Sequence, residues 1–195
     1  MDRRTLLRGG GGVALAGSFA GCLGTAGGLV NGAIRPAGGQ SVIHRADQHF
    51  LNDAYRVGPD ATYRAWLLDG TPPRDFFSPD VPAEDRRQLL LSLSQTDFGE
   101  QFVVFVEARM PVDERYFLTP TVFEDPRWTG LRTAALPVRR SDAADVEDPS
   151  FEDADELVCT ALVRFEARTT PRAATVEIYD KEGGRVGGVK TERPE

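Results

Sequence analysis

The residues best suited to metal chemistry are two histidines, a methionine and a cysteine. His44 and His49 stand five positions apart, whereas Met110 and Cys159 follow far downstream. A blue-copper site needs two histidines, a cysteine and a weak axial ligand, with one histidine and the methionine shortly after the cysteine. Nothing after Cys159 could coordinate, so the order argues against copper. The histidine spacing fits neither a helix face nor a strand face. It predicts a solvated pair, with a weak metal site as the alternative.

A dense acidic run is the second candidate for metal binding. Its members are Asp142, Asp145, Glu147, Asp148, Glu152, Asp153, Asp155 and Glu156. Calcium binds several carboxylate oxygens at once. The run lacks the glycine-containing D-x-D-x-D-G spacing, however, and Pro149 interrupts it. We therefore expect a solvated acidic loop between two strands, with calcium binding as the alternative.

The chain has two cysteines, Cys22 and Cys159, and only Cys159 lies outside the N-terminal region. It lies in the segment 157–168, where apolar and polar residues alternate. The alternation places Leu157, Cys159, Ala161, Val163, Phe165 and Ala167 on one face of a half-buried strand. We expect a buried thiol that packs as a small hydrophobe, not a nucleophile. The chain also contains no G-x-S-x-G, P-loop, G-x-G-x-x-G or H-E-x-x-H motif. The sequence thus predicts no catalytic residue, no metal and no cofactor.

The N-terminus carries a targeting pattern. Arg3 and Arg4 precede two leucines and a Gly/Ala-rich apolar run, and residues 19–21, Phe-Ala-Gly, precede Cys22. This pattern resembles a twin-arginine export signal that ends in a lipobox. The resemblance implies that Cys22 receives a lipid and becomes the first mature residue. The protein would then be held on the outer face of the cytoplasmic membrane, with the membrane as a partner through the lipid on Cys22.

These features divide the chain into three expected parts. Residues 1–21 are the signal peptide, residues 22–40 are a lipidated cysteine with a flexible Gly/Ala-rich tether, and residues 41–195 are one domain. An uncleaved transmembrane anchor is the alternative, because residues 9–34 contain no charge. Glycine crowds that stretch, which disfavours insertion.

The composition is acidic and poor in lysine. The chain carries 30 Asp and Glu against 23 Lys and Arg, a formal charge of −7, and its lysines are Lys181 and Lys190. This composition resembles that of exported proteins of salt-loving archaea, in which carboxylates keep the surface hydrated. A GC-rich genome that replaces lysine with arginine is the alternative. The net negative charge argues against a nucleic-acid partner.

Alternation of apolar and polar residues predicts several short strands. The expected strands are residues 63–68, 101–109, 131–139, 157–168, 174–179 and 185–190. Pro82, Glu84 and Asp85 predict a short helix over residues 82–90 that leads into a strand. In the segment 101–109 the residues expected inward are Phe102, Val104, Val106 and Ala108. We expect a mainly β fold, a single antiparallel β-sandwich with one short helix.

The segment 96–106 resembles part of a known family. Its Thr-Asp-Phe-Gly-Glu start, followed by an apolar strand, is similar to the C-terminal β-domain of PrcB-type proteins. The later strand and the segment 171–179 fit the same layout. The glycine-tyrosine pair of that family is replaced by residues 110–113, Met-Pro-Val-Asp. The resemblance implies a sandwich with a binding role and carries over no catalytic residue.

Two functions from different classes remain open from the sequence. The first is a non-catalytic module that binds an envelope protein, with Trp66 and Trp128 as expected contacts, joined by Phe76 and Phe77. These aromatic residues lie on proline-rich, loop-like stretches; the alternative is that they plug the ends of the sandwich. The second function is a cell-surface accessory hydrolase or substrate-binding protein.

Overall fold

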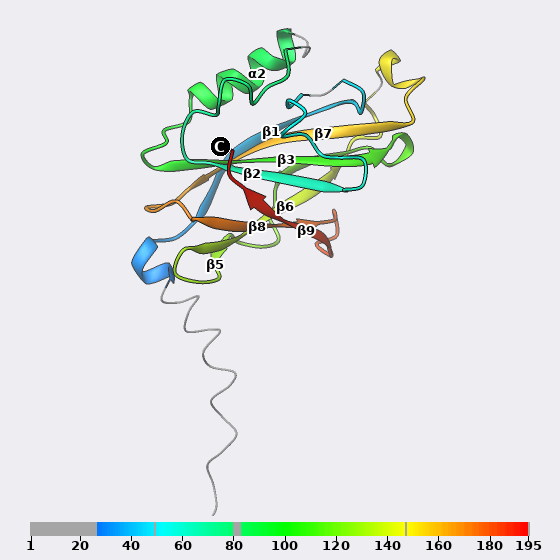
Figure 1. Cartoon of the computed structure of the whole chain (residues 1–195). Helices are drawn as coiled ribbons and strands as arrows, with labels where there is room; N and C mark the ends of the chain where they lie inside the picture. The colour runs from blue at the N-terminus through cyan, green and yellow to red at the C-terminus, as the bar shows by residue number, and fades with distance from the viewer. Residues whose placement is uncertain (1–26, 49, 80–82, 147, 195) are drawn as a thin grey trace, which may run out of the picture.

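The computed structural model describes residues 27–48, 50–79, 83–146 and 148–194. The fold is mainly β, with a nearly closed, barrel-like sheet and one helix, α2 (Ala83–Ser94), on its outside (Figure 1). A one-turn helix over residues 27–31 precedes the first strand. Among the described residues, no helix has the length and apolar character needed to cross a membrane.

Hydrogen bonds link the strands into one path. The strands are β1 (Arg35–Arg45), β2 (Tyr63–Leu68), β3 (Gln101–Pro111), β4 (Tyr116–Pro120), β5 (Arg127–Trp128), β6 (Thr133–Asp142), β7 (Glu156–Glu166), β8 (Ala173–Tyr179) and β9 (Arg185–Glu192). Their order is β1-β7-β3-β2-β9-β8-β6-β4, and β5 pairs with β6. The pairs β2–β9 and β6–β8 are parallel and the others are antiparallel.

The expected mainly β fold is confirmed, but the sandwich is not. A sandwich packs two separate sheets face to face, whereas here β2 and β9 join the two halves through the pairs Ala65–Thr191 and Trp66–Glu192. The strand assignments themselves are confirmed for β2, β3, β6, β7 and the β8–β9 hairpin. Strands β1 and β4 had no counterpart among the predicted strands.

The interior of the barrel holds the alternating faces that the sequence predicts. Phe102, Val104, Val106 and Ala108 of β3 are buried there with the predicted inward face of β7. The rings of Phe102 and Phe165 stack at a centroid distance of 5.5 Å. Because successive side chains on a strand point to opposite faces, the other residues of β3 face outward.

A second apolar layer covers the outer face of β2, β3 and β7. Segments 50–62 and 69–79 and helix α2 lie over this face, as Figure 1 shows. The layer is largely aromatic: the ring of Phe76 contacts Tyr55 at 4.9 Å and Phe105 at 5.3 Å. Segments 50–52 and 76–78 hydrogen-bond to each other through the backbones of Asn52 and Phe76. This outer layer positions the candidate sites described below.

The expected flexible tether is wrong for residues 35–40. Strand β1 begins at Arg35, which pairs with Glu166 of β7. The glycines that look like a tether have strand roles. Gly38 has φ +122, at the irregularity in the β1–β7 register, and a Cβ on Gly39 would lie 2.9 Å from the Leu162 carbonyl oxygen. Glycine is therefore required for curvature and close approach rather than for flexibility.

The helix is longer than the sequence predicts. It covers Ala83–Ser94, so the leucines expected to enter a strand belong to its last turns. Leu89 and Leu93, four residues apart, are buried against the outer aromatic layer. Pro82, the expected first residue, lies outside the described residues.

Candidate functional site

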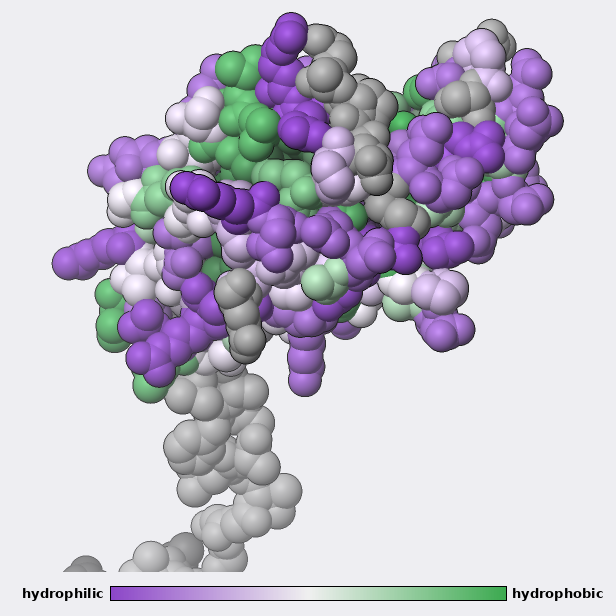
Figure 2. Space-filling model, turned by 45° about the horizontal axis from the view of Figure 1, so that its top comes forward, coloured by the Kyte–Doolittle hydropathy of each residue, from purple (hydrophilic) through white to green (hydrophobic). Residues whose placement is uncertain are grey.

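An apolar groove lies between α2 and residues 71–77; we call it the α2 groove. Its volume is about 480 Å³. Its apolar walls are Pro72, Pro73, Phe77, Leu90, Leu93 and Phe98. Figure 2 shows apolar residues gathered over the face that carries α2, with hydrophilic residues beside them. A concave apolar surface with a few polar groups at its border is the usual form of a binding site.

The three consecutive leucines of α2, Leu89, Leu90 and Leu91, lie on different sides of the helix. Leu89 and Leu93 point into the protein. Leu90 is 42% exposed and lines the α2 groove, whereas Leu91 is 52% exposed and does not line it. Residues adjacent in a helical sequence lie about 100° apart around the axis, so the three leucines cannot share one buried face.

Two arginines border the α2 groove. Arg74 is exposed, and Arg86 Nη2 donates hydrogen bonds to the carbonyls of Ser78 at 3.3 Å and Pro79 at 2.7 Å. Within the described part of the chain, the buried Arg86 Nε has no hydrogen-bond partner. Guanidinium groups bind carboxylates through paired N–H donors. The α2 groove therefore suits an apolar ligand that carries a carboxylate.

A buried polar row crosses the outer face of the same sheet beneath segment 50–62. Glu107 of β3 is its centre and is 2% exposed. Its carboxyl accepts hydrogen bonds from the Val57 backbone N–H at 2.5 Å and from Thr160 Oγ1 at 3.1 Å. His44 Nε2 lies 2.9 Å from the same Thr160 oxygen. We call Glu107, Thr160, His44 and Val57 the Glu107 network.

Burial dominates the electrostatics of this network. It raises the pKa of Glu107 from 4.5 to about 7, because the charged form loses hydration. The hydrogen bonds from Val57 and Thr160 and the positive charges of Arg64 and Arg56 act in the opposite direction and limit the rise. Glu107 therefore changes its protonation state near neutral pH, which an exposed glutamate does not do.

The state of Glu107 is coupled to His44 through the Thr160 hydroxyl. When Glu107 is ionised, Thr160 donates its proton to the carboxylate and accepts one from His44 Nε2. A protonated Glu107 can donate to Thr160 instead, whose proton then turns toward His44. His44 Nδ1 lies 3.1 Å from the Arg45 carbonyl oxygen, which only accepts hydrogen bonds. The hydrogen positions on Glu107, Thr160 and the His44 ring therefore depend on one another.

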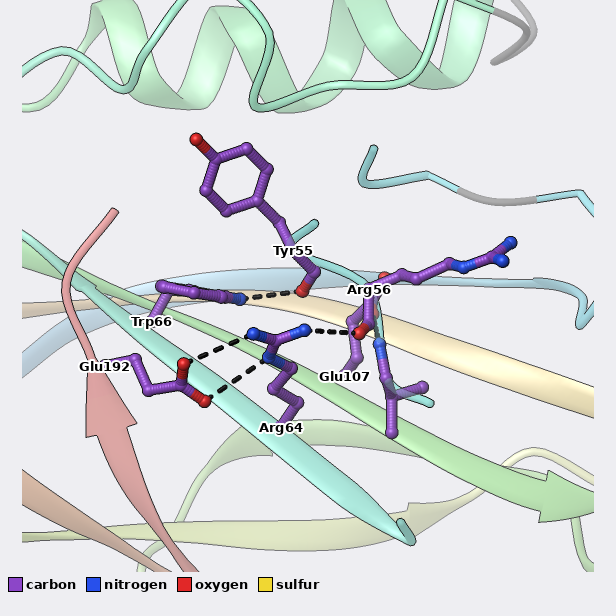
Figure 3. A network of polar contacts seen from close by, with 7 residues as sticks. Tyr55, Arg56, Arg64, Trp66, Glu107 and Glu192 are labelled. Carbon is purple, nitrogen blue, oxygen red and sulfur yellow. Dashed lines mark hydrogen bonds and ion pairs between the residues drawn. The ribbon is translucent and has the colours of Figure 1, made fainter. Parts of the chain in front are cut away.

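Figure 3 shows how the surrounding side chains hold segment 55–57 over the sheet. Arg64 donates to the Arg56 carbonyl at 2.9 Å and pairs with Glu192 at 3.2 Å. The Trp66 indole N–H donates to the Tyr55 carbonyl at 2.8 Å. These bonds, together with that of Glu107, attach one short covering segment at three points. Glu107 does not line the α2 groove, and its hydrogen bond to the Val57 N–H is one of the contacts that hold this segment.

Trp66 and Trp128 are not the exposed aromatic residues that the sequence predicts, which removes the basis for their expected contact role. Each is only 5% exposed. Trp66 belongs to the outer aromatic layer. Trp128 belongs to the barrel interior, and its indole N–H donates to the Gly32 carbonyl at 2.7 Å. Phe76 is buried as well, whereas Phe77 is half-buried and lines the α2 groove. Trp66 and Trp128 belong to strands β2 and β5 and face the two apolar cores, whereas Phe76 lies on an irregular segment that covers the outer face of the sheet.

His44 is not the fully solvated side chain that the sequence predicts. His44 is half-buried, bonded to Thr160, and its ring lies 6.0 Å from that of Phe50. His49 lies outside the described residues. The hydrogen bond to β7 arises because β1, which the sequence did not reveal, carries His44 beside Thr160.

The acidic run connects β6 to β7, as expected, and its end meets arginines. Asp153, Asp155 and Glu156 line a hollow of about 260 Å³ together with Arg45 and Arg109. The hydrogen bond from Arg109 lowers the pKa of Glu156. Among the described residues, no group of three or more His, Cys, Asp or Glu side chains is arranged to hold a metal ion. Glu147 lies outside them.

The expected burial of Cys159 is confirmed. Its side chain is fully buried in the barrel interior, and burial raises the thiol pKa to about 12. The reactive thiolate is therefore scarce at neutral pH. The export and lipidation residues, Arg3, Arg4 and Cys22, lie outside the described residues.

Sequence reasoning missed both the α2 groove and the Glu107 network, although each leaves a signal. Three consecutive leucines in a helix cannot all be buried, which marks an exposed apolar face. Glu107 directly follows the apolar run 102–106. In the alternation of that strand it occupies an outward position. A mostly buried strand makes such a glutamate exceptional.

Comparison with known proteins assigns no relationship. No protein-family model matches this chain, and no curated protein or solved structure matches it either. A functional conclusion therefore depends on the sites themselves.

Proposed function

We propose that this protein is a lipid-anchored extracytoplasmic binding module that holds a segment of a neighbouring envelope protein in its α2 groove. The observation that carries the proposal is the groove itself: an apolar channel of about 480 Å³ bordered by Arg74 and Arg86. Exposed apolar surface on a monomer marks an interaction site when polar residues border it.

The occupant we infer is an apolar polypeptide segment that carries carboxylates. Leu90 and Phe77 offer apolar contact area, and Leu90 is exposed when the groove has no occupant. The chain as a whole is acidic, with a formal charge of −7. Arg74 and Arg86 therefore place positive charge beside the α2 groove on a protein whose net charge is negative. Charge complementarity of this kind selects partners and orients them.

Cross-linking from positions 90 and 91 tests this function. A photoactivatable residue at Leu90 should capture an apolar, acidic segment of one envelope protein in intact cells, and the same residue at Leu91 should not. Both positions are exposed on α2, so neither substitution disturbs the core. Arg74→Glu should reduce capture at position 90 by about tenfold or more, because one lost charge-assisted contact corresponds to about 1.5–3 kcal/mol.

Mass spectrometry of the cross-linked peptide gives the segment's composition. Equal capture from positions 90 and 91, or capture at 90 that survives Arg74→Glu unchanged, would contradict the groove as the binding site. The Leu91 variant is a matched control, since it lies on the same helix, at similar exposure, without lining the groove.

The anchor part of the proposal is supported by the sequence pattern at residues 3–22. A diacyl-type lipid on Cys22 would hold the protein stably, where one chain alone would not. Cys22→Ser should shift the protein from the membrane fraction to the medium, or leave an uncleaved precursor in the membrane. Mass spectrometry of the wild-type protein extracted from membranes should find Cys22 as the first residue, with added lipid mass. An unmodified chain starting at Met1 would refute the anchor.

A further inference from the structure

Three exposed apolar side chains gather at the end of the barrel where the described chain begins. Leu29 is 80% exposed, Val30 is 64% exposed and Leu131 is 56% exposed. Leu29 and Val30 belong to the one-turn helix over residues 27–31, and Leu131 lies in the loop between β5 and β6. We call these three residues the apolar tip.

Specific contacts fix the N-terminal segment against this loop. Asn31 Nδ2 donates to the Leu131 carbonyl at 2.5 Å, and the Trp128 indole donates to the Gly32 carbonyl at 2.7 Å. A Cβ on Gly27 would lie 2.5 Å from the Gly130 carbonyl oxygen, so only glycine permits this approach. Figure 1 shows the short helix beside β5, away from α2. The apolar tip is therefore a built feature of the fold, held by partly buried hydrogen bonds.

Exposed arginines surround the apolar tip. Arg35 begins β1, and the backbone N–H of Arg172 donates to the Arg132 carbonyl at 2.8 Å. A Cβ on Gly32 would lie 3.2 Å from the Cβ of Arg168. The four arginines are exposed, and two carboxylates, Glu100 and Glu166, lie near Arg35 and Arg168 in the same hollow. This end is thus locally cationic on a protein whose overall charge is −7.

We propose that the apolar tip and its arginines dock onto the surface of an anionic lipid membrane. The inference rests on the proposed anchor in one respect: Cys22 is five residues before Gly27, a distance of at most about 18 Å even for a fully extended chain. An anchored Cys22 therefore places this end, and not the α2 groove, next to the lipid headgroups. Apolar side chains enter the boundary between headgroups and acyl chains, and arginines contact lipid phosphates.

Docking fixes the orientation of the domain. The apolar tip would face the membrane while the α2 groove, on the outside of a different part of the sheet, remains open to a partner. A lipid on a flexible tether alone would leave the domain free to rotate.

Fluorescence from single labelled positions tests the docking with full-length chain carrying Cys22→Ser, which removes the lipid. A polarity-sensitive fluorophore is attached at Leu131→Cys or, as the matched control, at Asp145→Cys beyond the other end of β6. Cys159 is fully buried and stays unlabelled in the folded protein. Vesicles of phosphatidylglycerol with phosphatidylcholine should shift the emission at position 131 to shorter wavelength and leave position 145 unchanged.

Variants of the apolar tip distinguish docking by the tip from membrane binding by residues 1–21. Leu29→Ser with Val30→Ser should weaken the partition of the position-131 label into vesicles by about tenfold or more, since burying one such side chain corresponds to that factor or above. Arg132→Ser with Arg168→Ser should reduce the preference for anionic over pure phosphatidylcholine vesicles. These four side chains are exposed, so the fold does not depend on them.

The outcomes are decisive in both directions. No shift at position 131, an equal shift at 145, or a shift that Leu29→Ser and Val30→Ser leave unchanged would overturn the docking. A shift produced by a bound envelope protein but not by vesicles would assign the tip to a protein and would also overturn it. Failure of lipidation at Cys22 in cells is a separate result, because the vesicle experiment uses a chain that carries no lipid.

Discussion

Replacing Glu107 with glutamine is expected to stabilise the protein above neutral pH and to leave its stability unchanged below about pH 5. The folded protein raises the pKa of Glu107 from 4.5 to about 7 by burial. A rise of this size corresponds to about 3 kcal/mol. Ionising the buried carboxyl therefore carries a large electrostatic cost.

The sign follows from linkage. Between about pH 4.5 and 7 the unfolded chain has released the Glu107 proton and the folded protein still holds it, so the free energy of unfolding falls as pH rises. The penalty is complete above the folded-state pKa. Glutamine stays neutral at every pH, fits the same space and can still accept a hydrogen bond from the Val57 N–H. The difference between Glu107→Gln and the wild type should grow from near zero to about 3 kcal/mol across this window.

Denaturant unfolding from pH 5 to pH 8.5, at constant salt, measures this difference. Glu156→Gln is the matched control of opposite sign: the pKa of Glu156 is lowered by Arg109, so its carboxylate stabilises the folded state at neutral pH. The free energy of unfolding of Glu156→Gln should be slightly below that of the wild type at pH 7 and equal to it in acid. A pH-independent gap between Glu107→Gln and the wild type would contradict the assignment of Glu107 as the buried titrating group.

The ionisation of Glu107 also has a structural consequence. Its carboxyl receives the Val57 N–H, and Arg64 holds the neighbouring Arg56 carbonyl, so the covering segment depends on polar bonds beneath it. Charging Glu107 strengthens the hydrogen bond from the Val57 N–H, but the charge is then held in a site without hydration, which costs more. The same carboxyl that titrates near neutral pH is thus one of the groups that hold segment 55–57.

The local periodicity of the chain predicted the barrel interior well. Phe102, Val104 and their neighbours alternate with a period of two, and such a pattern is decided by the residues of one strand. The β8–β9 hairpin follows from its turn residues, with Gly183 at φ +90 where an L-residue would be strained. Both signals are local, and both were confirmed.

Features that depend on distant chain segments were not predicted. Strand β1 is rich in glycine and weakly alternating, and it becomes a strand because β7 offers it a paired edge. The parallel contacts of β2 with β9 turn what looks like a sandwich into one path. The outer aromatic layer exists because segments 50–62 and 69–79 fold back over the sheet, which no short window of sequence encodes. The buried environment of Glu107 and the location of Trp66 follow from the same folding back.

Replacing Trp66 with alanine is expected to destabilise the fold by about 3–5 kcal/mol, the usual cost of removing a buried aromatic side chain. The Trp66 ring lies 5.2 Å from that of Tyr55 and 6.3 Å from that of Phe76, and the Arg64 guanidinium lies 4.6 Å over its face. Alanine would leave a cavity between the sheet and its covering segments. It would also leave the Tyr55 carbonyl without its indole donor.

Trp66→Phe separates the two contributions. Phenylalanine keeps most of the ring packing but has no N–H, so the loss should be about 1–3 kcal/mol from the unpaired Tyr55 carbonyl and the smaller ring. The fluorescence of Trp128 remains available to follow unfolding in denaturant. Leu91→Ser, an exposed change on α2, should stay within about 0.5 kcal/mol of the wild type.

The size of the Trp66 effect determines how partner-binding data must be interpreted. A loss of 3–5 kcal/mol is a large part of the 5–15 kcal/mol that a domain of this kind has in total. Weakened partner capture by Trp66→Ala would therefore report partial unfolding, whereas weakened capture by Arg74→Glu in a stable fold would report the α2 groove. A Trp66→Ala protein as stable as the wild type, with capture lost, would restore the tryptophan as a direct contact and contradict its buried place in the structure.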